Sequence, residues 1–183
     1  MDALELLLNR RSQPRLTAPA PAGEALENIK QAALRAPDHG ALMPWRFIVC
    51  EGEGREKLGS LFEQSAIDNG KSEKEIDRAP QLPLRAPMVI VAVAKYSDSP
   101  KVPRVEQIAS ASCAVMAMQM AAQAQGFNGI WRTGAYAQCD YVRSELGLAE
   151  DDELVGFLYL GTPAIETPSA PKRVSDDFFE HWS

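Results

Sequence analysis

Apolar residues recur at helical spacing in several parts of the chain. Near its start, Leu4, Leu7 and Leu8 stand at positions i, i+3 and i+4, which is the spacing of residues on one face of a helix. Asp2 can cap this helix, and Pro14 prevents it from continuing far. The same periodicity predicts helices over residues 2–10, 24–35, 55–78, 105–125 and 141–146.

The longest predicted helix covers residues 105–125 and would be roughly 32 Å long at about 1.5 Å per residue. Alanine, serine and methionine dominate it, so apolar residues surround most of the helix and small side chains let another backbone approach closely. Gly126 ends it. A helix of this composition is packed on several sides, as at the centre of a domain or of a dimer.

Short apolar runs predict four strands, over residues 47–49, 88–94, 129–131 and 154–160. The run Met88–Ala94 contains no polar residue, which is typical of a strand buried on both faces. Helices come first, and the strands are then separated by helices without a regular βαβ alternation. This order favours an α+β or three-layer architecture. The pattern shows neither an internal repeat nor a second domain, so it predicts one domain over residues 1–183.

The composition narrows the function classes. A net charge of −6 disfavours nucleic acid as a partner. The longest apolar run is far shorter than the roughly 20 residues that span a bilayer. Three scattered cysteines fit a reducing compartment, so we expect a cytoplasmic protein, and two histidines are too few for a usual zinc site. Neither G-x-G-x-x-G nor G-x-x-x-x-G-K-[ST] occurs, which argues against Rossmann and P-loop nucleotide sites.

Arg10, Arg11 and Ser12 form the first candidate binding cluster. Two guanidinium groups and a hydroxyl at the end of a helix can hold a phosphate, because arginine offers forked donors in a fixed geometry. The alternative is that these basic residues only complement the helix dipole. Judged by residue type alone, the alternative is the stronger explanation.

A second candidate cluster lies in residues 35–46, a segment broken by proline and glycine. It carries Arg35, His39 and Trp45 just before a predicted strand, which suits a ligand-binding loop. The alternative is a surface turn in which Trp45 enters the core and His39 is merely exposed.

The third candidate cluster covers residues 126–134. Gly129 and Gly134 flank the end of a predicted strand, where backbone N–H groups can face a ligand, and Arg132 adds positive charge. A glycine-bounded strand with one buried aromatic residue explains the same composition equally well.

Together these segments resemble the nitroreductase family of FMN-dependent oxidoreductases, and most closely a compact subgroup of NAD(P)H nitroreductases. The resemblance follows the family's order over nearly the whole chain. Six motifs carry it: NRRS from residue 9, RAPDH with MPWRFIV from residue 35, SASCAVMAMQMAAQAQG from residue 110, GIWRTG from residue 129, GFLYLGTP from residue 156 and KRVSDDFFEHW from residue 172.

The resemblance implies a nitroreductase-like α+β fold with a mixed or antiparallel central sheet flanked by helices. It places the long helix at a homodimer interface where FMN is bound, with NADH or NADPH as the hydride donor. Catalysis needs no side-chain acid or nucleophile, because the hydride chemistry belongs to the flavin. We therefore expect alternating reduction and reoxidation, in which the donor leaves before a nitroaromatic, quinone or similar electron-poor acceptor enters.

The resemblance also assigns site residues. Arg10, Arg11 and Ser12 would bind the phosphate and ribityl chain, and Arg35 and His39 would reach FMN from the partner subunit. The remaining cofactor-binding residues would be Trp131, Arg132, Thr133 and Arg173. The nicotinamide nucleotide would bind at Ala121, Ala122, Gln123, Ala124, Gln125 and Gly126.

The chain departs from the family pattern in one loop, and its function has competing explanations. Gly40, Ala41, Leu42 and Met43 stand where larger members often carry serine, asparagine or glutamine, which removes side-chain hydrogen bonds to the flavin edge. The roles of Leu42 and Met43 and the physiological substrate stay open. The alternatives are a reductase of an unsaturated or halogenated metabolite, a flavin-binding dimer with little turnover, and a dimer without cofactor.

Overall fold

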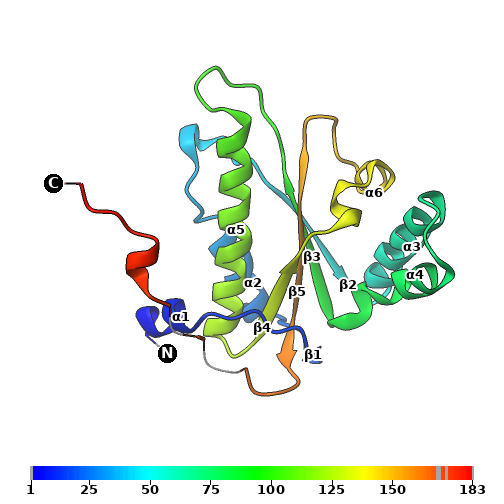
Figure 1. The fold of residues 1–183 in the computed structure, drawn as a ribbon, viewed down its shortest axis with the longest axis horizontal. Helices are drawn as coiled ribbons and strands as arrows, with labels where there is room; N and C mark the ends of the chain where they lie inside the picture. Colours follow the sequence, from blue (N-terminus) through cyan, green and yellow to red (C-terminus); the bar gives the residue numbers. More distant parts are fainter. Residues whose placement is uncertain (1, 168–169, 172, 183) are drawn as a thin grey trace.

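The computed structural model describes residues 2–167, 170–171 and 173–182. Within them, five strands form one sheet whose pairings are all antiparallel, and helices cover both of its faces (Figure 1). The strand order is β1-β5-β3-β2, and β4 also pairs with β5. The predicted α+β class with a central sheet flanked by helices is therefore confirmed. The strands are β1 (Leu16–Thr17), β2 (Arg46–Glu51), β3 (Met88–Ala94), β4 (Asn128–Arg132) and β5 (Glu153–Pro163).

β3 is buried at every position because it lies between β2 and β5 and beneath helices on both faces. Its side chains alternate between two cores, as the pleat of a strand requires. Val89 and Val91 point into one core, whereas Met88 and Ile90 point into the other. This double burial explains the run without polar residues.

The helices form a layer on each side of the sheet (Figure 1). α3 (Glu53–Asp68), α4 (Glu73–Arg78) and α6 (Asp140–Glu145) share one core with the sheet. α2 (Glu24–Ala33) and α5 (Arg104–Ala124) share the other core, and the short α1 (Ala3–Asn9) contacts α5. None of the helices in the described segments is long and apolar enough to cross a membrane.

Two local features differ from the sequence prediction. The helix expected over residues 55–78 is interrupted: α3 ends at Asp68, Gly70 takes a φ of 60°, and Ser72 starts α4 with a capping box to Glu75. The two-residue β1 was not predicted, because it is too short to show any alternation and exists only through its pairing with Pro163 and Thr162 of β5.

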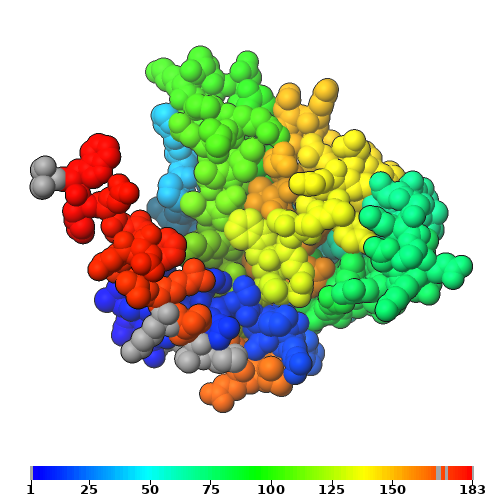
Figure 2. Space-filling model, in the orientation of Figure 1, coloured from blue at the N-terminus to red at the C-terminus, as the bar shows by residue number. Residues whose placement is uncertain are grey.

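Apolar side chains remain exposed along one side of the molecule. On α5, Val105 is 70% and Met116 46% exposed. Leu8 of α1 and Trp182 of the C-terminal segment are also largely exposed. Figure 2 shows the C-terminal segment beside α1 and extending away from the body of the molecule. Exposed apolar surface of this extent is typical of a contact with another molecule.

Candidate functional site

The first predicted cluster lies at the edge of a hollow of about 1080 Å³. Arg10, Arg11 and Ser12 line it from the segment after α1, and Arg173 lines it from the C-terminal segment. The fold thus brings together residues that are far apart in the sequence. Three guanidinium groups and a hydroxyl around one hollow can together bind a doubly charged phosphate.

Gln13 fixes this cluster in place. Its backbone N–H donates to the carbonyl of Gly129 at 2.9 Å, and its side-chain Nε2 donates to the carbonyl of Ile165 and the hydroxyl of Thr167. Gln119 of α5 donates to the same Gly129 carbonyl at 2.8 Å. The N-terminal segment, α5, the start of β4 and the C-terminal segment therefore meet at one buried point.

β4, which is part of the third predicted cluster, runs away from this hollow. The strand leaves Gly129 beside Gln13 and reaches Arg132, about 10 Å further along at about 3.3 Å per residue. At this end of the strand, two neighbouring cavities of about 470 and 590 Å³ are both lined by Trp131, Thr133 and Gly134. A ligand with a phosphate at one end and a flat ring at the other could follow the strand.

Trp131 is held by a hydrogen bond from its indole N–H and by apolar contacts of its ring. Its indole Nε1 donates to the carbonyl of Val155 at 3.1 Å, and its ring packs against the core beneath α5. Gly156 leaves room for the indole, because a Cβ there would lie 2.5 Å from Nε1. The ring is thus positioned before any ligand arrives.

Arg132 carries an unsatisfied donor. Its Nε is buried and lacks a hydrogen-bond partner within the described residues, while its Cζ lies 5.7 Å from the centroid of the Tyr159 ring. Burial raises the pKa of Tyr159 to about 12, so its phenol stays protonated at neutral pH. A buried donor without a partner costs about 1–3 kcal/mol. An acceptor on a ligand would remove that cost, so this residue fits an FMN site.

Two further basic residues of this site were not predicted from the sequence. Arg78 and Arg85 line the 470 Å³ cavity together with Arg132, and Tyr136 forms part of its wall. Within the described residues, none of the three arginines forms an ion pair. Arg78 ends the helix predicted over residues 55–78, and Arg85 stands in the proline-rich loop before β3, so neither position suggested a site.

The second predicted cluster lies at the opposite end of α5. The Nδ1 atom of His39 is 2.8 Å from Oε2 of Glu106, in the first turn of α5, and Arg35 lies just beyond the end of α2. The hollow lined by Arg10, Arg11 and Arg173 lies near Gln119 instead. These two positions on α5 are about 20 Å apart along the helix. One copy of the chain therefore does not bring Arg35 and His39 to Arg10–Ser12.

The predicted nicotinamide segment is the C-terminal end of α5. Ala122 is fully buried, and Gln125 is occupied by contacts within the chain: its Nε2 donates to the carbonyls of Ala25 and Ala121, and its Oε1 accepts from Asn28. Those contacts join α5 to the start of α2. Nicotinamide binding at Ala121–Gly126 stays a prediction.

Comparison with known proteins agrees with this geometry. The sequence model of the Nitroreductase family matches residues 7–162. The chain is 56% identical to YdjA of Escherichia coli (strain K12), assigned as an NAD(P)H nitroreductase, over 93% of both chains.

Solved structures show the same fold. A nitroreductase-like family protein from Bacillus cereus superposes with a TM-score of 0.83 at 23% identity, covering 100% of this chain and 96% of the other. An FMN-dependent nitroreductase from Clostridium difficile R20291 gives a TM-score of 0.67 at 26% identity, covering 92% and 91%. The matched residues span most of the sequence, and the chain belongs to the nitroreductase family.

Proposed function

We propose that the protein is an FMN-dependent oxidoreductase that uses NADH or NADPH to reduce electron-poor small molecules such as nitroaromatics and quinones. One observation carries the proposal: β4 joins a hollow lined by Arg10, Arg11 and Arg173 to cavities lined by Trp131 and Arg132. The family supports it, and so does the name of the Clostridium difficile relative, which is called FMN-dependent.

The residues of the site would share the work of holding FMN. Arg10, Arg11, Ser12 and Arg173 would neutralise the phosphate, and Trp131 would provide a flat apolar wall for the ring. When bound, the flavin accepts a hydride and passes electrons to the acceptor. The chain's own contribution is to bind, to orient and to exclude water. Because the donor and the acceptor would both react at the one flavin ring, they would occupy the same cavity in turn.

A homodimer would complete the site. Two copies related by a two-fold axis across the exposed face of α5 would run their helices in opposite directions. The Arg35 and His39 end of one copy would then lie beside the Arg10–Ser12 end of the other. The exposed Val105 and Met116 side chains support this face as the contact.

The test is a spectrum followed by kinetics. We expect purified protein to show flavin absorbance and to oxidise NADH or NADPH only when an acceptor is present, with parallel double-reciprocal plots. Arg10→Gln should weaken FMN binding by about tenfold or more, since a charge-assisted hydrogen bond contributes about 1.5–3 kcal/mol. Arg15→Gln is the matched control, because Arg15 is exposed nearby but does not line the hollow.

Two outcomes would contradict the proposal. A colourless protein that gains no flavin absorbance during titration with FMN would exclude the cofactor. Stoichiometric FMN that NADH and NADPH reduce only slowly would indicate a flavin-binding protein with little turnover.

A further inference from the structure

A further cavity of about 370 Å³, here called the distal cavity, adjoins the 470 Å³ cavity beside Arg132. The two share part of their lining, so a molecule that enters one can extend into the other. The shared residues are Arg78, Leu82, Ala135 and Tyr136. The distal cavity is lined by residues of α3 and α4. Figure 1 shows these helices on the other side of the sheet from α5.

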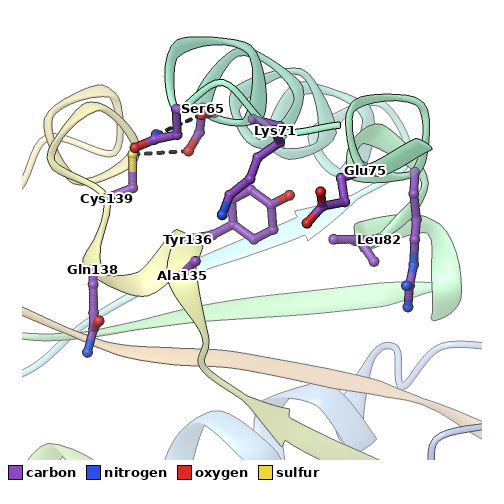
Figure 3. Close-up of a pocket in the computed structure, with 11 residues that line it drawn as sticks. Ser65, Lys71, Glu75, Leu82, Ala135, Tyr136, Gln138 and Cys139 are labelled. Atoms are coloured by element: carbon purple, nitrogen blue, oxygen red, sulfur yellow. Dashed lines mark hydrogen bonds between the residues drawn. The ribbon is translucent and has the colours of Figure 1, made fainter. Parts of the chain in front are cut away.

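Tyr136 forms a rigid flat wall of the distal cavity. Its ring stacks on Phe62 with centroids 4.3 Å apart and an interplanar angle of 11°. Figure 3 shows Lys71 and Glu75 reaching from the α3–α4 side toward this ring. Burial is the largest cause of the raised pKa of Tyr136, and the nearby Glu75 carboxylate adds to it. The phenol therefore stays protonated at neutral pH.

Glu75 supplies a fixed carboxylate. Its Oε2 accepts from the backbone N–H and the hydroxyl of Ser72, at 3.1 and 2.6 Å, which leaves Oε1 for a ligand. The Ser72 side-chain and backbone hydrogen bonds lower the pKa of Glu75, so it is ionised at neutral pH.

Four basic side chains line the two cavities. Arg85 and Arg132 line the cavity beside Trp131, Arg78 lines both cavities, and Lys71 lines the distal one. Lys71, Arg78 and Arg85 are exposed, and across the described residues none of the four forms an ion pair, although the chain has a net charge of −6. Arg78 and Lys71 line the distal cavity, so a ligand there meets two cations and the carboxylate of Glu75. These groups fit a ligand that carries both phosphate and hydroxyl groups.

We propose that the distal cavity binds the adenylate half of the nicotinamide dinucleotide, with the nicotinamide ring in the adjoining cavity beside Trp131. Arg78 and Lys71 contact the phosphates, the carboxylate of Glu75 accepts from ribose hydroxyls, and the adenine stacks on Tyr136. This inference rests on the proposed function, because it concerns the hydride donor of that reaction. It differs from a donor site at Ala121–Gly126, where Gln125 is held by α2.

Titration calorimetry with ADP-ribose tests the binding step on the FMN-containing protein. We expect measurable affinity for the wild type and about tenfold weaker binding for Arg78→Gln and for Lys71→Gln. Lys74→Gln is the matched control: Lys74 lies on α4 with Arg78 and is exposed like Arg78 and Lys71, but it lines neither cavity. Equal affinity of the wild type and the Arg78 variant would overturn the proposal.

Kinetics with two donors test the same contact in the reaction. NADH should exceed reduced nicotinamide mononucleotide, which lacks the adenylate half, in kcat/KM. Lys71→Gln, at a residue that lines only the distal cavity, should reduce that advantage by about tenfold. If the Arg78→Gln variant lost affinity for the acceptor 4-nitrobenzoate but kept its affinity for ADP-ribose, the distal cavity would belong to the acceptor and the proposal would be overturned. ADP-ribose binding that depends on Arg78, in a protein that oxidises neither donor, would uphold the distal site and refute the proposed function.

Discussion

Trp131 lies against Gly156, where the backbone and the available space both select glycine. Gly156 has a φ of 142°, a region that residues with a side chain rarely adopt. A Cβ at this position would lie 2.5 Å from Nε1 of Trp131 and 2.6 Å from the carbonyl oxygen of Arg132. The position of the indole and the course of β4 at the candidate site therefore depend on one missing side chain.

Replacing Gly156 with alanine should lower the free energy of unfolding by about 1–3 kcal/mol, because the backbone is strained and the indole must move. Urea denaturation measures the loss, and a shift of the tryptophan emission that is absent when Gly156→Ala is made in a Trp131→Phe background reports the displacement of Trp131. Gly54→Ala is the matched control: a Cβ there has its nearest neighbour at 3.8 Å, inside α3. Similar losses for both variants would contradict this account.

Individual site residues were predictable only where they are close in sequence. Arg10, Arg11 and Ser12 stand together, so the sequence alone indicates a phosphate-binding cluster. Arg78, at the end of α4, and Arg85, in the loop before β3, become neighbours of Arg132 only because both segments fold against the end of β4. Spacing along the chain carries no trace of that contact, and these arginines were missed for that reason.

Among the secondary-structure elements, α6 is followed by a turn that a residue of β2 holds. The carbonyls in the last turn of α6 accept from the backbone that follows, with the N–H of Leu146 donating to Val142 and that of Gly147 to Ser144, whereas the carbonyls of Leu146 and Gly147 themselves need an outside donor. Arg46, at the start of β2, supplies two donors: NH2 to the carbonyl of Leu146 at 2.7 Å and NH1 to that of Gly147 at 2.9 Å. The arginine of the second candidate cluster that enters β2 thus has a structural contact.

Arg46→Met should lower the free energy of unfolding by about 1–2 kcal/mol, because two carbonyls lose charge-assisted hydrogen bonds at a partly exposed site. Arg46→Lys keeps the charge and can still donate to one of the two carbonyls, so the free energy of unfolding should fall by less. Chemical denaturation of the two variants checks the order. If methionine is tolerated as well as lysine, α6 does not rely on this contact.

The elements themselves were largely predictable, and the exceptions have physical causes. α5 and β3 were predicted within one residue of their ends, since each is long or apolar enough to leave a clear pattern. The break between α3 and α4 was not predicted because Gly70 and Ser72 interrupt a charge-rich pattern that continues on both sides. Local pattern does not reveal β1 at all, because only β5 makes it a strand.

For the whole molecule, the length of α5 determines how a complete site can arise. Arg35 and His39 lie at one end of the helix and Arg10–Ser12 near the other. A monomer that held FMN with all of these residues would need α5 to be much shorter. The proposed two-fold pairing across the exposed face of α5 solves this without any change in the chain.

Met116→Lys should raise the dissociation constant of the proposed dimer by about a hundredfold, because a charge would be buried in an apolar contact. FMN occupancy should fall with it. Ile67→Lys is the matched control, since Ile67 is 49% exposed but lies on α3, on the opposite layer. Analytical ultracentrifugation with absorbance at flavin wavelengths measures both quantities. A wild-type monomer that retains FMN would contradict the dimer.

A single domain over residues 1–183 and a cytoplasmic location stay predictions.

The buried meeting point at Gln13 has a consequence for how the protein matures. It joins a segment made early in synthesis to Ile165 and Thr167, which emerge from the ribosome late, and Arg173 follows later still. The hollow lined by Arg10, Arg11 and Arg173 is thus complete only once translation has passed the sheet and helices α1 to α6. If this hollow binds FMN as proposed, a nascent or prematurely terminated chain lacks part of the phosphate site.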